Sequence, residues 1–478
     1  MLRDSLRGFL GTQWNPEAAA KPSDSAEAIA AIWTRLVGQG VATLGRDFTE
    51  GGLREILVVM TELGRASCPA PMWSAALANL AFSGCRAEVA ADLLERLHEG
   101  TARVAFSFGA LDPDTNAGSI QLGDGRASGL LRFVEVAESC THLVVSNEHS
   151  GLAIIALDGP GVELEPTRAM GVWGLYEVRL KDAPASRVDL PSTALDDRLL
   201  EGKLALAARA QGAARAAFDM TVDYAKERKQ FGQPIGRFQA IQHKLANGLI
   251  ALEGVRLTLD HAAHLHDRED KNWRYFVNAA VAFACDALRQ VSLETQHTLG
   301  AIGYAEEHHA PRHFKRVHLD TIALGGAAEA RRRVASFLFD RGGTALPQYD
   351  LGPAANELRE QAQAWLDENW SGERKAAFDM RPFSRREFDA DFARDIGQTG
   401  WIALGWPRDF GGQARTPLEQ IAFIETMERG EAPRIGAAIQ ANALMMFGTP
   451  AQQERYLPEI LRGEAMHGMG YSEPEAGS

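Results

Sequence analysis

Residues 224–246 read YAKERKQFGQPIGRFQAIQHKLA, and this stretch joins the end of one helical pattern to the start of the next. Arg228 and Phe231 lie beside a turn that Gly232 and Pro234 favour. Arginine binds phosphate through paired hydrogen bonds, and an exposed aromatic ring stacks on a flat heteroaromatic base. The stretch therefore suits a nucleoside diphosphate, although a solvated basic helix end capped by glycine is the more common use of this composition.

The overall composition is that of an ordinary soluble globular protein. The chain has 478 residues, of which 50 are Lys or Arg and 63 are Asp or Glu, so its formal net charge is −13. An acidic balance argues against a dedicated nucleic-acid binder, which needs a basic face. The four cysteines are scattered without paired spacing, which is typical of a reducing compartment: Cys68, Cys85, Cys140 and Cys285.

No stretch of the sequence indicates a membrane span or a metal site. Uninterrupted apolar runs stay well below 18 residues, and the first residues lack the apolar core of a signal peptide. Two histidine-rich stretches, 260–270 and 306–318, do not supply a convincing third ligand. The sequence therefore predicts a cytoplasmic protein with no membrane partner, no nucleic-acid partner and no metal.

Three zones follow one another in the first 340 residues. Residues 1–100 carry helical periodicity, as in SAEAIAAIWTRLVGQG, and glycines end the helical runs. Residues 101–195 contain short β-prone runs such as HLVVS and LAIIAL, separated by Gly, Asp and Pro. Residues 196–340 return to long helical patterns. We expect a helical domain, a small β domain and a helical bundle.

The chain also repeats itself. Residues 36–52 read LVGQGVATLGRDFTEGG and residues 396–412 read IGQTGWIALGWPRDFGG, with four glycines and one leucine matched at an offset of 360. Two further pairs of segments match: 59–66 with 423–430, and 93–108 with 455–471. Matched glycines mark shared backbone requirements rather than average hydrophobicity. We interpret the pattern as a tandem duplication.

The second copy follows a linker and is shorter than the first. Residues 341–355 contain glycines and prolines that are typical of a linker. Residues 356–465 then correspond to the N-terminal helical domain of copy one, and residues 466–478 to the start of its β domain. We expect copy two to be incomplete at Ser478.

Two motifs resemble the signatures of the acyl-CoA dehydrogenase family. One is the opening stretch, 224–246; the other is GYSEPEAGS, 470–478. The resemblance implies a mainly α fold with a small β domain: a helical N-domain, a β-barrel middle domain and a four-helix-bundle C-domain. The two-copy arrangement resembles actinobacterial acyl-CoA dehydrogenases that act on sterol side chains. FAD would be the cofactor, and an acyl-CoA, possibly a steroid thioester, the substrate.

The resemblance also implies which residues meet FAD and substrate. In the family, the element matching Arg228, Gln230 and Phe231 holds the adenosine-diphosphate part of a neighbour's FAD. The other implied contacts with FAD are a glycine turn, with Gly300 and Gly303, and a flavin-edge loop, with Tyr471, Ser472 and Glu473. Ser478 is the implied contact with the pantetheine of the acyl-CoA. The family usually has Gln three residues before that first glycine, where this chain has His297, with Gln296 one place off.

Copy one lacks the residues that the resemblance requires for catalysis. The usual position of the carboxylate base is occupied by Gly325, and an alternative position on the first long helix by Gly202. A shift of one residue in the alignment would make Glu201 the candidate base. Residues 105–114 lack the flavin-edge loop, and residues 134–143 lack the family's Trp-x-Thr contact. The sequence predicts that copy one is catalytically degenerate.

These expectations combine into one hypothesis with open alternatives. Copy two would hold the flavin ring and substrate, its base would lie beyond residue 478, and copy one would hold the diphosphate end of FAD. An electron-transfer flavoprotein is the expected electron acceptor, and a homodimer of fused chains is the expected assembly. The alternatives are a non-catalytic scaffold or partner half of a flavoprotein complex, and an acyl-CoA oxidase-like enzyme.

Overall fold

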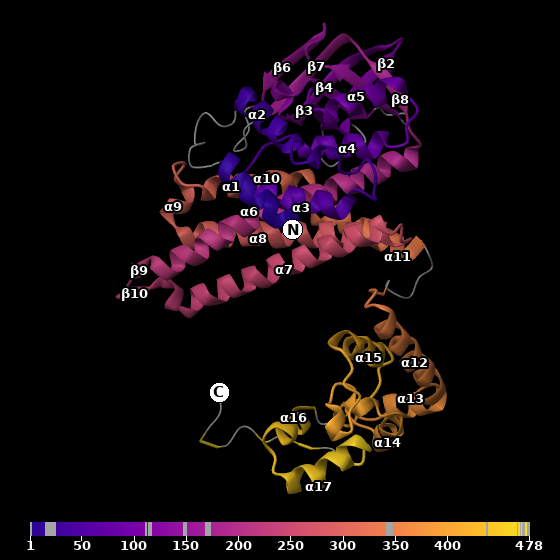
Figure 1. Cartoon of the computed structure of the whole chain (residues 1–478). Helices are drawn as coiled ribbons and strands as arrows, with labels where there is room; N and C mark the ends of the chain where they lie inside the picture. Colours follow the sequence, from indigo (N-terminus) through magenta and orange to yellow (C-terminus); the bar gives the residue numbers. More distant parts are fainter. Residues whose placement is uncertain are drawn as a thin grey trace. The chain divides into compact units, whose positions relative to one another are not determined.

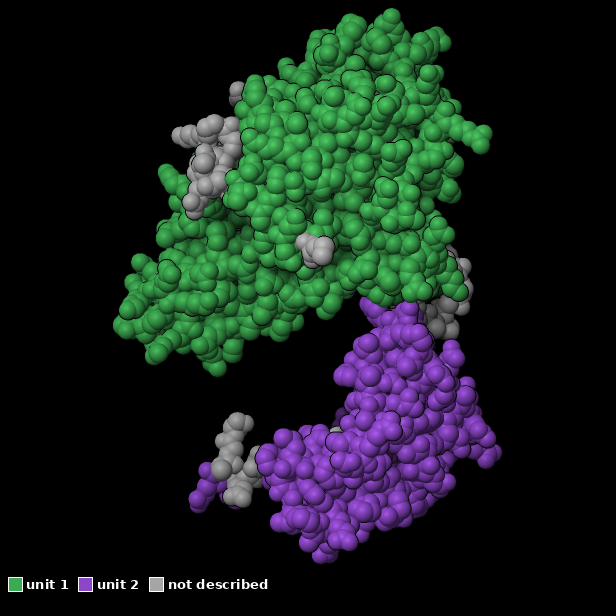
Figure 2. Space-filling view, viewed as in Figure 1, with its two compact units in different colours: residues 1–346 green, residues 347–478 purple. Residues whose placement is uncertain are grey.

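The structure is a computed structural model that divides the chain into two compact units, residues 1–346 and residues 347–478 (Figures 1 and 2). It describes residues 2–14, 25–109, 112, 117–146, 151–167, 174–340, 348–435, 438–465, 467–468, 470 and 474–475. Within these residues, no helix combines the length and the apolar composition needed to cross a lipid bilayer.

Unit 1 begins with five helices that share one apolar core. They are α1 (Leu2–Gln13), α2 (Ala26–Val37), α3 (Leu53–Arg65), α4 (Met72–Phe82) and α5 (Glu88–His98). α2 begins where the Ser25 hydroxyl accepts a hydrogen bond from the amide of Ala28, which satisfies one of the free donors at a helix start. α4 is buried along almost its whole length, because it contacts both strand β1 (Val104–Ser107) and helix α6 (Ser192–Glu227).

In the residues that the structure describes, the middle of unit 1 forms eight strands in two four-stranded sheets. After β1 come β2 (Gly118–Gly123), β3 (Arg126–Glu135), β4 (His142–Ser146), β5 (Gly151–Ala156), β6 (Val162–Pro166), β7 (Leu175–Pro184) and β8 (Ser186–Asp189). One sheet has the order β1-β4-β5-β8 and the other β2-β3-β7-β6; only the β1–β4 pair is parallel.

The expected barrel is not closed. In the described residues no strand of one sheet pairs with a strand of the other, so each sheet keeps two free edges. Apolar side chains such as Leu131, Leu143 and Val178 fill a core that is shared between the sheets. The sequence correctly predicted short strands here, but the pairing that distinguishes a barrel from two sheets depends on contacts far apart in the chain.

The last part of unit 1 is a bundle of long helices. α6 is followed by α7 (Gln239–Asp267), α8 (Trp273–Leu299), the short α9 (Ala301–Tyr304), α10 (Ala310–Ala323) and α11 (Gly326–Asp340). α6, α7 and α8 pack along one another, and α3 packs along α6 (Figure 1). The sequence of α6 is rich in alanine, which allows this close packing on several sides. The predicted fold class, mainly α with a small β region, is confirmed.

Unit 2 is helical. It contains α12 (Pro353–Asn369), α13 (Gly372–Asp379), α14 (Ala390–Thr399), α15 (Pro417–Arg429), α16 (Ala438–Phe447) and α17 (Pro450–Leu461). α15 and α17 begin with capping boxes in which Thr416 pairs with Glu419, and Thr449 with Gln452. The aromatic side chain of Phe392 lies at the centre of the core and contacts the ring of Trp370.

Candidate functional site

A two-residue hairpin presents Phe231 to solvent. Strands β9 (Lys229–Gln230) and β10 (Gln233–Pro234) pair antiparallel, and the turn residues Phe231 and Gly232 have φ of 52° and 81°. Positive φ at both turn positions suits a tight hairpin of the type I′ class. The Phe231 side chain is 93% exposed and meets Phe238 edge-on, with the ring centroids 6.1 Å apart. An apolar ring held in this way is available to stack on a ligand.

Arg228 is fixed by its backbone and free at its side chain. Its amide donates to the Tyr224 carbonyl (2.8 Å), and its own carbonyl accepts from the amide of Ile235 (2.8 Å). The guanidinium is exposed and makes no ion pair with any residue that the structure describes. Gln230, by contrast, turns its side-chain amide to the Lys229 carbonyl (2.7 Å). The hairpin therefore offers the Arg228 guanidinium and an exposed ring, a combination that fits a diphosphate attached to a base.

The glycine turn after α8, with Gly300 and Gly303, lies next to Gln296 and His297. Gly300 ends α8 with φ of 64°, and a methyl group on Gly303 would lie 2.8 Å from Oε1 of Gln296. Gln296 is thus buried beneath the turn, whereas the His297 ring is exposed and its Nδ1 accepts a hydrogen bond from Lys244 Nζ (2.9 Å). Of the two residues considered for the family's Gln contact, the one that faces outward is His297.

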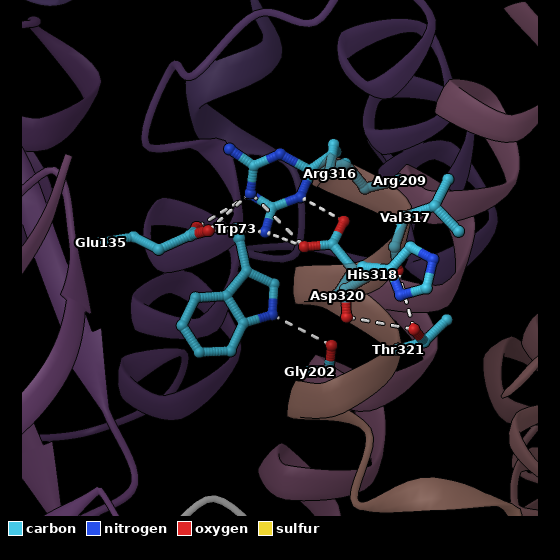
Figure 3. Close-up of polar contacts among 9 residues, drawn as sticks. All are labelled: Trp73, Glu135, Gly202, Arg209, Arg316, Val317, His318, Asp320 and Thr321. Atoms are coloured by element: carbon cyan, nitrogen blue, oxygen red, sulfur yellow. Dashed lines mark hydrogen bonds and ion pairs between the residues drawn. The ribbon is translucent and has the colours of Figure 1, made fainter. Parts of the chain in front are cut away.

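A buried cluster of four charges joins β3, α6 and α10 (Figure 3). Arg209 makes two hydrogen bonds of 2.9 Å to the Glu135 carboxylate and bonds of 2.7 and 3.0 Å to Asp320. Arg316 donates to Glu135 (2.7 Å) and approaches Asp320 (3.4 Å). Two cations thus balance two anions, of which Asp320 is buried and Glu135 is 22% exposed at its side chain.

The charge cluster lowers the pKa of Glu135 and includes the end of strand β3. Burial alone would raise the pKa of Glu135, but the charges and hydrogen bonds of Arg209 and Arg316 outweigh it and hold that pKa well below its usual range. Glu135 ends β3, within the segment 134–143 that the resemblance associates with the flavin ring. In this segment two guanidinium groups, those of Arg209 and Arg316, bind the Glu135 carboxylate.

Glu201 is also held by cations. Its Oε1 accepts hydrogen bonds from Arg198 (2.6 Å) and from His266 Nε2 (2.8 Å), and the side chain is fully buried. His266 Nδ1 faces Asp267 (3.1 Å) on its other side. Burial would lower the pKa of His266, but the hydrogen bonds to Asp267 and Glu201 outweigh it and raise the pKa to about 9. The Glu201 carboxylate is engaged by Arg198 and His266 inside the protein, so this geometry favours a structural role for Glu201.

Gly202 lies against aromatic and apolar side chains, and Gly325 lies in a turn with positive φ. The indole Nε1 of Trp73 donates to the Gly202 carbonyl (3.0 Å; Figure 3), and a methyl group on Gly202 would lie 3.3 Å from the Phe108 ring. Gly325 has φ of 82°, a left-handed backbone that favours glycine. The nearby Glu329 pairs with arginines of its own helix, Arg332 and Arg333. None of these described groups supplies a free carboxylate at the position expected for a base.

The sequence analysis missed the charge cluster and the ion pairs around His266. A signal for the first was present, since Arg209 is the single charged residue in the run LALAARAQGAA, 204–214, and a lone arginine in an alanine-rich helix predicts a buried ion pair. Its partners Glu135 and Asp320 lie 74 and 111 residues away, and nothing in the sequence relates them. The predicted loop residues Tyr471, Ser472, Glu473 and Ser478 lie outside the described residues.

Two family models match the chain, both from one family. The acyl-CoA dehydrogenase C-terminal domain matches residues 193–339, and the acyl-CoA dehydrogenase N-terminal domain matches residues 353–464. Together with the three-part fold of unit 1, these matches define the class of protein. The chain belongs to the acyl-CoA dehydrogenase family.

Two of the relatives come from Mycobacterium tuberculosis. The chain is 30% identical over 435 residues to the acyl-CoA dehydrogenase FadE34 of Mycobacterium tuberculosis. The matched region covers 90% of this chain and 56% of FadE34. It is 28% identical over 348 residues to the acyl-CoA dehydrogenase IpdE2 of the same organism, covering 71% of this chain and 97% of IpdE2. The chain thus spans little more than half the length of FadE34.

Solved structures share the fold. A variant of the Tcur3481-Tcur3483 steroid ACAD superposes with a TM-score of 0.60 at 26% identity, over 72% of this chain and 99% of that chain. The ChsE4-ChsE5 complex from Mycobacterium tuberculosis gives a TM-score of 0.60 at 23% identity, over 73% and 98% of the two chains, and shows the fold alone.

Proposed function

We propose that this chain is part of an FAD-dependent acyl-CoA dehydrogenase in which residues 1–340 form a catalytically degenerate copy and residues 356–478 begin a second copy. The order of the matched domains supports the duplication, since a C-terminal domain at 193–339 precedes an N-terminal domain at 353–464. The backbone supports it too: Gly40 and Gly400, at the repeat offset of 360, have φ of 77° and 76°. Each precedes a short 3₁₀ helix.

The proposal rests mainly on a contrast between two parts of unit 1, the hairpin at Arg228 and Phe231 and the charge cluster. The hairpin offers a free guanidinium at Arg228 and a free ring at Phe231, which fit the diphosphate and adenine of FAD. The segment that the resemblance associates with the flavin ring instead carries Glu135, which is bound to Arg209. Copy one would therefore hold the nucleotide end of a cofactor whose flavin is held elsewhere, by the loop at 471–473.

The chemistry of the family is removal of a proton and a hydride from neighbouring carbons of an acyl-CoA, and FAD supplies the hydride acceptor when bound. In unit 1, Arg228 would neutralise the diphosphate and Phe231 would cover the adenine, which fixes the cofactor without supplying a base. The α,β-unsaturated acyl-CoA would form at the second copy, where Ser478 would contact the pantetheine. One similar structure is named a steroid ACAD, so we extend the proposal to a steroid side-chain thioester. We further propose an electron-transfer flavoprotein as acceptor, a homodimer and a cytoplasmic location.

A second candidate function is a non-catalytic partner half of a flavoprotein complex. It is favoured by the absence of a free carboxylate near Gly325 and by the ion pairs that hold Glu201, among the described residues. In that case the chain would support the structure of a flavoprotein complex without holding FAD itself, and it would not oxidise an acyl-CoA.

The flavin absorbance of the purified protein tests the proposal. Arg228→Ala should reduce the flavin content markedly, because the diphosphate would lose its cation. Arg126→Ala provides a matched control, since Arg126 is an exposed arginine on β3 whose loss should leave flavin unchanged. Full retention of flavin in Arg228→Ala would show that copy one does not hold the cofactor. Absence of flavin from the unaltered protein would favour the non-catalytic alternative.

A further inference from the structure

A groove runs between α7 and α8 in unit 1. Its volume is about 470 Å³, and its lining also includes Phe218 of α6 and Arg331 of α11. The two helices that form its sides pack along each other (Figure 1). Ligand sites in proteins have volumes of roughly 300–1,000 Å³, so the groove is large enough to hold a small molecule.

The groove exists because small residues line it on both helices. Gly248 and Ala251 of α7 and Ala287 of α8 all face it, and side chains of this size leave a space that leucine or phenylalanine would fill. The Phe218 ring forms the floor beneath Gly248, where an added methyl group would lie 3.1 Å from the ring. Phe218 is itself buried. The interior of the groove is therefore apolar.

The groove is long and narrow. On α8 its lining extends from Phe283 to Thr298, which corresponds to roughly 22 Å along the helix axis. A volume of about 470 Å³ over that length leaves room for one chain of atoms rather than for a fused ring system. A helix of another protein, with a diameter of about 10–12 Å, is too wide to enter it. We therefore expect an elongated small molecule.

The charged side chains around the groove neutralise one another. Lys244 Nζ lies 2.7 Å from Oε2 of Glu294, and Arg331 Nη2 lies 2.5 Å from Oδ2 of Asp286. These two pairs contain all the charged residues of the described lining. A charged ligand would have to break one of the pairs or bring its own charge unpaired against the apolar floor, and both cost free energy. The lining therefore favours an uncharged molecule.

Two buried hydroxyl groups determine the polar end of the ligand. Thr295 Oγ1 donates to the Ser292 carbonyl (2.8 Å), and Thr298 Oγ1 donates to the Glu294 carbonyl (2.7 Å). Both threonines line the groove and are at most 9% exposed. Since each hydroxyl has already used its single proton, its oxygen can only accept a further hydrogen bond. The matching group on a ligand is a donor, and a hydroxyl is the simplest uncharged one.

We propose that the groove between α7 and α8 binds an uncharged, single-chain aliphatic alcohol. Its hydrocarbon chain lies over the Phe218 ring, and its hydroxyl donates to Thr295 or Thr298. The proposal is independent of the cofactor role, since the described lining does not include the hairpin at residues 228–234.

Isothermal titration calorimetry of the full chain with 1-hexanol, 1-octanol and 1-decanol tests the proposal. Binding should be saturable, and the Kd should fall roughly fourfold for each added methylene group, because each one buries a further CH₂ in the groove. Octanoate at pH 7 should bind at least about tenfold more weakly than 1-octanol, since its carboxylate meets cations that are already paired.

Variants of the lining separate the site of the chain from the site of the hydroxyl. Ala287→Trp fills the groove and should abolish saturable binding. Ala246→Trp, at an exposed position of α7 outside the described lining, is the matched control and should leave the Kd unchanged. The double variant Thr295→Val with Thr298→Val nearly keeps the side-chain size but removes both acceptors. It should raise the Kd of 1-octanol roughly 2- to 13-fold without changing the step per methylene group.

Three results would overturn the proposal: no saturable binding to the unaltered protein, as when a second copy covers the groove; equal Kd values for octanoate and 1-octanol; or unchanged binding in Ala287→Trp. Circular dichroism shows whether each variant is folded. If Ala287→Trp does not fold, the double threonine variant decides, and an unchanged Kd for 1-octanol in that variant would also overturn the proposal.

Discussion

Arg209 of α6 and Glu135 at the end of β3 face each other in a two-point ion pair, with both N–O distances at 2.9 Å. The pair connects the helical bundle to the β region, and Asp320 of α10 closes the cluster on the other side. The strand thus ends in a carboxylate that is bound to arginine. The cluster therefore links β3, α6 and α10 through one set of ion pairs.

Removing the Arg209 cation should be strongly destabilising. Arg209→Met keeps the length of the side chain but leaves Glu135 and Asp320 without their principal partner. Loss of one member of a buried ion pair costs about 3–5 kcal/mol. Denaturant unfolding followed by circular dichroism would measure it. Arg126→Met, which removes an exposed ion pair with Asp182, should change the free energy of unfolding by less than about 1 kcal/mol. Equal effects of the two substitutions would contradict the structural role of the cluster.

Stability should fall in mildly alkaline solution because of His266. Its pKa is about 9 in the folded protein, above the ordinary value of 6.5, so folding binds a proton more tightly. The contribution of His266 is complete below about pH 6.5 and is lost as the pH rises through about 9, an effect of roughly 3 kcal/mol. The free energy of unfolding, measured from pH 6 to pH 10, should follow this course.

His266→Gln should remove most of that pH dependence, because glutamine can still donate to Glu201 but does not titrate. The exposed His243 offers a matched control, and His243→Gln should leave the pH profile unchanged. An unaltered profile in His266→Gln would mean that other groups cause the alkaline loss of stability.

The close crossing of α3 and α6 should make Gly64 intolerant of a side chain. A methyl group there would lie 1.9 Å from the Arg209 carbonyl, so Gly64→Ala forces the helices apart at a cost of about 1–3 kcal/mol. Gly8→Ala in α1 meets no atom within 4 Å and should instead stabilise by up to about 1 kcal/mol through helix propensity. Thermal unfolding of the two variants should therefore shift in opposite directions. A Gly64→Ala protein as stable as the original would show that α3 and α6 are not in backbone contact.

The sequence was informative where one local pattern decides the structure. Helical periodicity predicted the helical zones, short β-prone runs predicted the strands, and Gly232 with Pro234 predicted a turn, because each depends on neighbouring residues. The charge cluster and the His266 ion pairs could not be derived, since Glu135, Arg209 and Asp320 are distant in sequence and only the fold brings them together. The open barrel was missed for the same reason.

The exposed ring of Phe231 gives a test of nucleotide binding that does not depend on stability. Because the side chain is 93% exposed, Phe231→Ala removes almost no buried area and should leave thermal unfolding unchanged. Loss of an aromatic stacking surface costs about 0.5–1.5 kcal/mol, which corresponds to a decrease in FAD affinity of roughly 2- to 13-fold. Phe231→Tyr should retain most of the affinity, since the ring remains.

Phe383, 87% exposed in unit 2, provides a matched control, and Phe383→Ala should not change flavin content. Flavin titration by fluorescence measures all three variants. An affinity that is equal in Phe231→Ala and in the unaltered protein would remove the hairpin from the cofactor site, whereas a loss confined to Phe231→Ala would locate the adenine at this exposed ring.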